Sequence, residues 1–546
     1  MKIGQKQSPS YPKGGLVVVL TLVFALGFFL GGRNILAEVE GWLSFATQLV
    51  HDDSAAELLP TLVVDMGFDN YNNLLQQREE ALQTGVTLLT NQDFVTATMR
   101  LDDSLVPVTM RFYPGPAEHL KEASKWHFDV RTRRGQHLEG MQRFYLLDPA
   151  EDNWLNQWAF ARSLEREGVL ATRTQFVNLV FNGDSWGPYA LQEGFGDELM
   201  TANGRTAGVI LEFDADLLWR SIAHFGDAER AYADPVGNLL ATDFRFFEID
   251  AFRDATIAQD TARLAQRDAA VSRLRALQAG QLPASDIFEV EAYGRFLALV
   301  DLWGANEAVS LPNLRYYYDP DSGRLEPIGF NGNPLSSEER LPLIAAYGDA
   351  VLQAAYAREA ERLGQPAYLA ELESELGEEL LHLQRALRPE AGQLALPWAA
   401  LQQRQEQIRR SLNPIQPVFA YLGPPTMSVS ATIQVDVANV INLPVEVIGF
   451  DINGTTFLEA DPAWLRTAAA TDLVSVRGDQ IILSATGSSL IRYVRFHLPT
   501  TEIIRLDQET DFTHPIEINV ATRILGLDEH QFTLAREGAP DQFIAP

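Results

Sequence analysis

An uncharged apolar run near the N-terminus constrains this chain more than any other feature. Residues 14–32 (GGLVVVLTLVFALGFFLGG) are dominated by Val, Leu and Phe. As a helix, the run would reach roughly 28 Å, close to the thickness of the hydrocarbon core of a bilayer. The sequence therefore predicts one transmembrane anchor, because no later segment is long and apolar enough to span.

The charges on either side of the run predict its orientation. Lysines and no acids precede it, whereas acids dominate the segment after it. The positive-inside rule then makes residues 1–13 a cytoplasmic tail, residues 33–58 a juxtamembrane spacer and the remainder an ectodomain outside the cell membrane. A cleaved signal peptide is the alternative, but the run is long for one and no clear A-x-A site follows.

Composition excludes several functions for the ectodomain. The chain has 46% apolar residues, as an ordinary folded protein has, and a net charge of −30. Such a charge repels phosphate backbones, so nucleic-acid binding is excluded. The absence of cysteine removes disulfides, thiolate metal sites and thiol nucleophiles.

Two folded regions follow the spacer. Residues 59–415 predict a mixed α+β region, with an Asn-Gly hairpin at 182–183 and a leucine-faced helix over 369–387. Residues 425–546 alternate apolar and polar side chains, which predicts a separate all-β sandwich.

Walker, GxSxG, HExxH and GxGxxG motifs are absent, and the histidines show no metal spacing. Four segments of the first region are more specific: HLKEASKWHFDVRTRRG (119–135), the helix predicted at 154–168, RTQFVNLVFNGDSWGPYALQE (173–193) and YGRFLALVDLWGANEAVSLPNLRYYYDPDSGRLEPIGF (293–330). In these segments and their order, the region resembles the CotH kinase family, the spore-coat-protein-H-like atypical kinases.

The resemblance implies a two-lobed kinase-like ectodomain, with an antiparallel β-rich N-lobe and a mostly helical C-lobe. It implies ATP and Mg²⁺ (or Mn²⁺) as cofactors if the protein is active, held between phosphates and polar side chains. By resemblance, Lys125 would contact phosphate and Glu193 would face the nucleotide. The alternatives are that Lys125 caps a strand edge and that Glu193 forms a hinge salt bridge.

The catalytic stretch departs from the family pattern. Glu307 stands near the place of the expected catalytic Asp, and Asn313 matches the family's metal-binding Asn. Asn331 stands where a metal-binding Asp is expected. A neutral amide can coordinate Mg²⁺ through its oxygen but adds no charge, so the substitution should weaken metal–nucleotide binding.

Two functional interpretations follow. The first is a membrane-anchored, ATP-dependent Ser/Thr protein kinase that acts on envelope or cell-surface proteins. The second is a catalytically inactive pseudokinase, a surface module that binds protein or polysaccharide. The scarcity of ATP outside the membrane and the departures from the motif favour the second, whereas the family resemblance favours the first.

Overall fold

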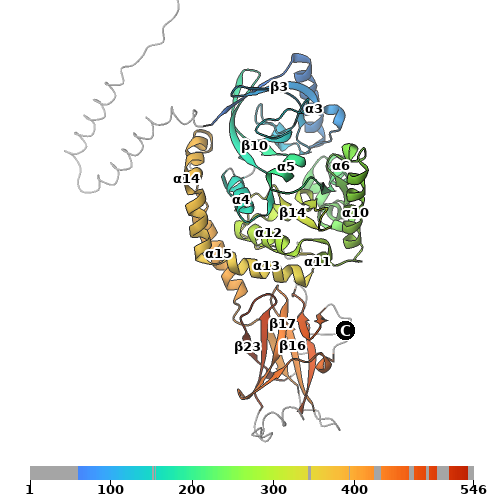
Figure 1. Ribbon diagram of the computed structural model, residues 1–546, viewed down its shortest axis with the longest axis vertical. Helices are drawn as coiled ribbons and strands as arrows, with labels where there is room; N and C mark the ends of the chain where they lie inside the picture. The colour runs from blue at the N-terminus through green and yellow to red at the C-terminus, as the bar shows by residue number, and fades with distance from the viewer. Residues whose placement is uncertain are drawn as a thin grey trace, which may run out of the picture.

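The computed structural model has three folded parts in chain order, a β-barrel, a unit of helices around a sheet and a β-sandwich (Figure 1). It describes residues 59–150, 153, 155–341, 346–392, 394–423, 432–466, 473–486, 491–500 and 516–538. The predicted anchor at 14–32 and its flanking segments lie outside these residues. Within them, no helix combines the length and apolar character needed to cross a bilayer.

The first part is a closed seven-stranded barrel, which confirms the predicted β-rich start of the α+β region. Neighbours around it are antiparallel except β1 and β9, whose parallel pairing closes the barrel. In order around the barrel, its strands are β1 (Thr61–Asp65), β3 (Val95–Leu101), β4 (Ser104–Phe112), β6 (Phe128–Thr132), β7 (Arg143–Leu147), β10 (Asp184–Glu193) and β9 (Thr174–Phe181). Helix α3 (Phe68–Thr84) lies against it.

The hairpin between β9 and β10 forms at the predicted dipeptide. Asn182 and Gly183 both have positive φ, 50° and 91°, as the tight turn of a twisted hairpin requires. Register is regular up to a bulge between Ser185 and Gly187, where β10 bends. The bulge is important below because Gly187 faces a helix of the second part.

The second part is not helical alone, because a five-stranded sheet runs through it. The strands are β12 (Glu248–Ala251), β11 (Val209–Asp214), β13 (Arg315–Tyr318), β14 (Leu325–Gly329) and β8 (Leu170–Ala171). The helices around it include α4 (Leu155–Arg166), α5 (Asp197–Ala202), α6 (Asp216–Phe225), α10 (Thr261–Gln278), α12 (Val290–Trp303), α13 (Ala350–Leu363), α14 (Pro366–Ala391) and α15 (Trp398–Leu412).

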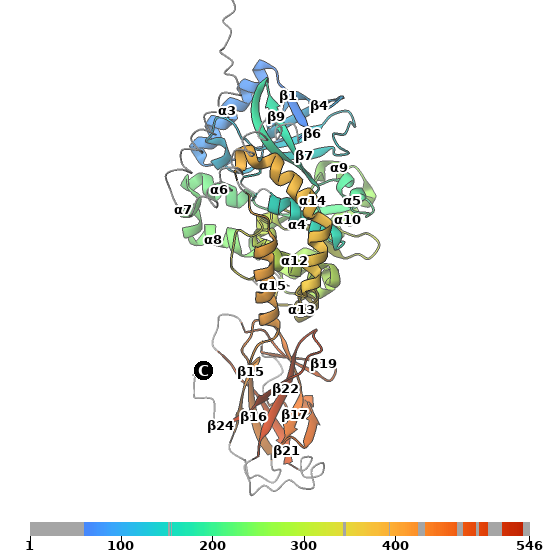
Figure 2. The same ribbon diagram turned by 90° about the vertical axis from the view of Figure 1, so that its left-hand side faces the viewer.

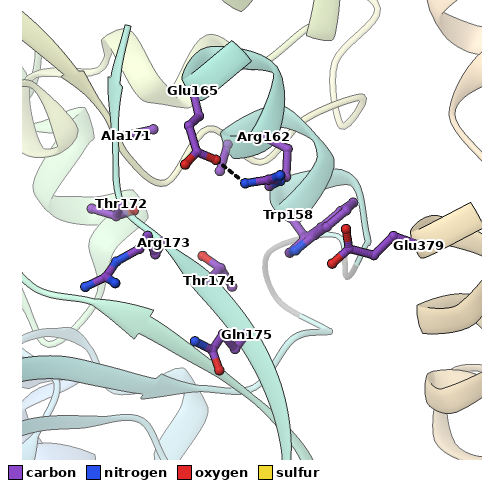
Figure 3. A pocket seen from close by; sticks show the side chains of 10 residues that line it. Trp158, Arg162, Glu165, Ala171, Thr172, Arg173, Thr174, Gln175 and Glu379 are labelled. Atoms are coloured by element: carbon purple, nitrogen blue, oxygen red, sulfur yellow. Dashed lines mark hydrogen bonds and ion pairs between the residues drawn. The ribbon is translucent and has the colours of Figure 1, made fainter. Parts of the chain in front are cut away.

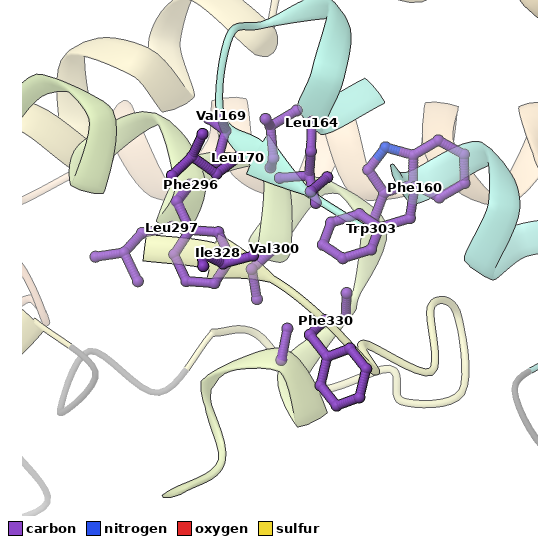
Figure 4. Close-up of a cluster of buried hydrophobic side chains, with 14 of the residues drawn as sticks. Phe160, Leu164, Val169, Leu170, Phe296, Leu297, Val300, Trp303, Ile328 and Phe330 are labelled. Carbon is purple, nitrogen blue, oxygen red and sulfur yellow. The ribbon is translucent and has the colours of Figure 1, made fainter. Parts of the chain in front are cut away.

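The core of this second part forms between α12, α4 and the sheet. Figure 4 shows Phe296, Leu297 and Val300 of α12 beside Ile328 of β14. Helix α12 is buried on nearly every side because its apolar residues leave few polar positions. It ends at Gly304, whose φ of 56° suits a helix C-cap, and this stop places Glu307 in the next turn.

Removing one large side chain from this core is expected to destabilise the protein measurably. The Phe296→Ala substitution should lower the free energy of unfolding by about 3–5 kcal/mol, because it removes a fully buried ring and leaves a cavity. Phe68→Ala is the control, since that ring is 76% exposed. Denaturant unfolding followed by fluorescence would measure both, and equal effects would contradict the packing described here.

The third part is a sandwich of two sheets, as the alternating pattern predicts. One sheet contains β21 (Val494–Pro499), β16 (Thr432–Asn439), β15 (Val418–Leu422) and β24 (Arg536–Glu537). The other contains β19 (Val474–Arg477), β20 (Gln480–Leu483), β17 (Val445–Ile452), β18 (Thr456–Glu459), β22 (Ile518–Ile524) and β23 (Gln531–Leu534). Strand β15 belongs to the sandwich, where it pairs with β16, although it precedes the predicted start at residue 425. In the sequence, its apolar run lacks the alternation of the later strands.

Candidate functional site

A cleft of about 630 Å³ lies between the barrel and the second part. Arg111 of β4 and Arg143 of β7 line it from the barrel. From the other side come acids of β11 and β12, the loops after α12 and the end of β14. The residues lining that side include Glu212, Asp214, Asp216, Asp250, Glu307, Asn313, Arg315 and Asn331.

Three of the residues predicted for the site meet in this cleft. The amide Nδ2 of Asn313 donates to the backbone carbonyl of Glu307 at 3.1 Å and to that of Asn331 at 3.3 Å. The carboxylate of Glu307 accepts a hydrogen bond of 2.8 Å from Nδ2 of Asn333. Glu307 remains exposed to the cleft, so an orienting contact holds the carboxylate while leaving it accessible.

The side-chain oxygen of Asn331 is an unsatisfied acceptor in the cleft. Its Oδ1 is buried and accepts no hydrogen bond from the described residues. The backbone φ of 42° lies in the left-handed region, which Asn tolerates better than most residues. A buried acceptor oxygen costs free energy unless something satisfies it, so the amide fits a cation or a donor from a bound molecule.

A buried carboxylate organises the cations on the barrel side. Asp129 is fully buried and contacts Arg143 at 3.0 Å, Arg111 at 3.2 Å and Arg131 at 3.7 Å. Burial raises the pKa of Asp129, but the guanidinium groups of Arg143, Arg111 and Arg131 outweigh it and hold that pKa below its usual value. Asp129 therefore stays ionised and fixes Arg111 and Arg143 at the cleft.

On the opposite side of the cleft, a row of charged side chains crosses the sheet of the second part. Glu212 of β11 stands opposite Arg315 of β13 on one side and Asp250 of β12 on the other. Arg315 contacts Glu212 at 3.0 Å, and its Nε, although buried, has no hydrogen-bond partner among the described residues. Burial raises the pKa of Glu212 despite Arg315. Arg315 and Arg143 both stack on Phe252, 5.4 and 5.8 Å from its ring centroid.

Two histidines complete the wall on the barrel side. His119 and His127 stack with ring centroids 4.5 Å apart and an interplanar angle of 9°. Burial lowers the pKa of His119 to about 4. The ring is therefore neutral at physiological pH and adds no positive charge to the cleft, which leaves the arginines as its cations.

Lys125 does not line the cleft. Its ammonium group lies 2.8 Å from Glu390 Oε2 on α14 and donates to the carbonyl of Pro188 at 2.8 Å. The contact of Lys125 with phosphate stays a prediction, because the contacts described here direct its ammonium group to α14 and not into the cleft.

Glu193 also lies away from the cleft, and only 1% of its side chain is exposed. It accepts a bidentate pair from Arg173 at 2.8 and 2.7 Å, the salt bridge that was the alternative expectation. Figure 3 shows Arg173 in a second pocket of about 260 Å³, with Arg162 and Glu165 of α4 and Glu379 of α14. The predicted role of Glu193 as a residue that faces the nucleotide stays a prediction.

Sequence reasoning missed the arginines and acids of the cleft. Glu212 was detectable as a charged residue inside the apolar strand VILEFD (209–214). Arg315 opens the predicted strand RYYY (315–318), and Arg143 opens RFYLL (143–147). None of these signals indicates that the strands face one cleft, because that depends on how the barrel sits on the sheet.

The comparison with protein families agrees with the sequence resemblance. Residues 118–241 match the CotH family model, described as CotH kinase protein. The matched stretch runs from the turn that carries His119 through the β9–β10 hairpin and the strand that carries Glu212 to helix α8 (Pro235–Thr242), so this stretch is similar to the CotH family. A search of curated proteins finds no match to the chain.

Proposed function

We propose that the protein is a CotH-like atypical kinase that binds a nucleoside triphosphate with a divalent cation in the cleft and transfers phosphoryl to Ser or Thr of other proteins. The observation that carries the proposal is the meeting of Glu307, Asn313 and Asn331. Kinase chemistry needs a carboxylate for the acceptor hydroxyl and oxygen ligands for the metal in one place. The CotH match over residues 118–241 supports the same class.

The residues present fit Mg²⁺ or Mn²⁺ bound to a nucleotide. The Oδ1 of Asn331 lacks a partner among the described residues. Both hydrogen bonds of Asn313 use its Nδ2, which leaves its Oδ1 for a ligand. When bound, the cation would offset phosphate charge and bridge phosphate oxygens to these amides.

The cleft's own charges make a divalent cation necessary for nucleotide binding. Six carboxylates line it against three guanidinium groups, so it repels a free triphosphate. The acids are Glu118, Glu212, Asp214, Asp216, Asp250 and Glu307, and the arginines are Arg111, Arg143 and Arg315. The arginines would contact phosphate oxygens, in place of the lysine of the resemblance. Glu307, held by Asn333, would accept the proton of the acceptor hydroxyl.

The pseudokinase is the second candidate, and Asn331 is the observation that favours it. A neutral amide replaces a charged metal ligand there. Among the described residues, no group of three or more His, Asp or Glu side chains is placed to hold a metal ion. In this case the cleft and the sandwich would serve as a binding module for a surface protein or polysaccharide.

The location is part of the proposal. The run at 14–32, with its preceding lysines, supports a single-pass anchor with the N-terminus in the cytoplasm. Envelope or cell-surface proteins are then the partners that the outward-facing part would meet. Protease added to intact cells should degrade this part, and full protection would contradict the orientation.

Nucleotide binding by the purified protein tests the proposal. Calorimetry with ATP should show binding with Mg²⁺ or Mn²⁺ and at least roughly tenfold weaker binding with EDTA. Without the cation, the carboxylates of the cleft repel the phosphates. Transfer of labelled phosphate to a protein acceptor separates the two candidates. Binding without transfer would favour the pseudokinase, and no binding at millimolar ATP with either metal would contradict the proposed nucleotide site.

A further inference from the structure

Helix α14 connects the second part to the barrel on the side away from α6, whose Trp219 lines the cleft. Figures 1 and 2 show α14 along one side of the second part, reaching up to the level of the barrel. The leucines of one helix face are buried in the core of the second part. On another face, Arg166 of α4 contacts Glu371 at 3.0 Å and Glu375 at 2.9 Å. The first half of α14 is therefore anchored to α4.

An ion pair links the last turn of α14 to the barrel. Glu390 Oε2 lies 2.8 Å from the ammonium of Lys125. That ammonium also donates to the carbonyl of Pro188 and lies 5.2 Å from the ring centroid of Tyr189. The ion pair is only half-buried, so its strength depends on how well both side chains are held.

The barrel is shaped around this contact. Gly187, at the bulge of β10, has a φ of 77°, and a Cβ there would come within 1.6 Å of Glu390 Oε1. Any other residue would displace the carboxylate. Lys125 itself has a φ of 70°, a left-handed conformation that is costly for a lysine and persists only where its surroundings hold it. Two unusual backbone positions thus bring one lysine and one glutamate together.

We propose that α14 is a brace that sets the opening of the cleft, with Lys125 and Glu390 as the positioning residues that attach it to the barrel. The barrel carries Arg111 and Arg143 on one side of the cleft, whereas α14 is anchored to the part that carries Glu307. Loosening the pair lets the barrel tilt away from the second part. The effect on nucleotide affinity rests on the proposed function, but the effect on opening does not.

The absence of cysteine allows a direct measurement of the opening in the full-length protein. Spin labels at Asp103→Cys, in the exposed β3–β4 turn, and Glu361→Cys, at an exposed position of α13, report the distance between the parts. We expect a single narrow distance distribution for the parent protein. Glu390→Gln should broaden it, Glu390→Lys should broaden it further, and Lys125→Glu combined with Glu390→Lys should narrow it again relative to Glu390→Lys alone.

Nucleotide titration of the same variants distinguishes a brace from a ligand. We expect Glu390→Gln and Lys125→Met to weaken Mg²⁺-ATP binding by a similar factor, about two- to fivefold, because a half-exposed ion pair shifts an equilibrium only modestly. Glu406→Gln is the control, because Glu406 forms a comparable but exposed pair with Arg410 within α15. It should change neither the distances nor the affinity.

The outcomes separate the brace from its alternatives. Loss of binding in Lys125→Met with no change in Glu390→Gln would make Lys125 a nucleotide ligand and overturn the brace. Unchanged distances in every variant would overturn it as well. If the parent protein binds no nucleotide, the proposed function fails, and the distance distributions alone decide on the brace. Should Lys125→Met fail to fold, Glu390→Gln carries the test, because it leaves the strained backbone unaltered.

Discussion

Replacing Glu307 by glutamine is expected to lower the rate of phosphoryl transfer about 10²–10⁴-fold, with nucleotide affinity changed by no more than about threefold. Glutamine keeps the shape and the hydrogen bond from Asn333 but cannot accept the proton of an acceptor hydroxyl. Glu307 lines the cleft and is exposed to it. A steady-state assay of phosphate transfer, with calorimetry of ATP binding, separates the two effects.

A matched substitution on the same side of the protein supplies the control. Glu338 is an exposed glutamate of the following loop and does not line the cleft. Glu338→Gln should leave both rate and affinity unchanged. Equal transfer rates for Glu307→Gln and the parent protein would show that Glu307 is not the base, even if the cleft binds nucleotide.

The Asp129→Asn substitution is expected to destabilise the protein as much as the loss of a buried aromatic ring does. Asparagine leaves Arg111, Arg131 and Arg143 without their counter-charge, so the free energy of unfolding of the barrel should fall by about 3–5 kcal/mol. Arg111 and Arg143 would also lose the contact that fixes them at the cleft, so nucleotide binding should weaken. Thermal unfolding and calorimetry measure the two consequences.

The same group predicts a dependence of stability on pH. The folded-state pKa of Asp129 lies below its unfolded value, so its stabilisation is complete above the unfolded pKa of about 3.9 and is lost as the pH falls through the folded pKa. In the Asp129→Asn variant this loss should be absent. Asp103→Asn, at an exposed turn of the same barrel, is the control and should behave like the parent protein.

Local patterns were sufficient to predict several elements of the fold. Alternation predicts the β3–β4 pair, Asn182 with Gly183 predicts the β9–β10 hairpin, and spaced leucines predict α14. The sheet of the second part was only partly predictable, because β8 and β12 are short and their partners are distant in sequence.

The site was predictable where motif residues follow one another closely and not where packing decides. Glu307, Asn313 and Asn331 all follow α12 within one compact segment, so family spacing was enough to bring them together. Lys125 was expected at phosphate from the family resemblance, on a strand before the helix of the lobe. Its direction depends on a left-handed backbone and on a partner in α14, and neither feature is visible in a local pattern.

In the proposed function, Asn313 and Asn331 would hold the metal of a bound nucleotide in the cleft. A crystal of the protein grown with Mn²⁺ and a non-hydrolysable ATP analogue tests it most directly, because anomalous scattering locates manganese without assumptions about the ligand. We expect a manganese peak within coordination distance of Oδ1 of Asn331, with the phosphates beside Arg143 and Arg315. A manganese–nucleotide complex bound elsewhere, or a cleft without either at millimolar concentrations of both, would contradict it.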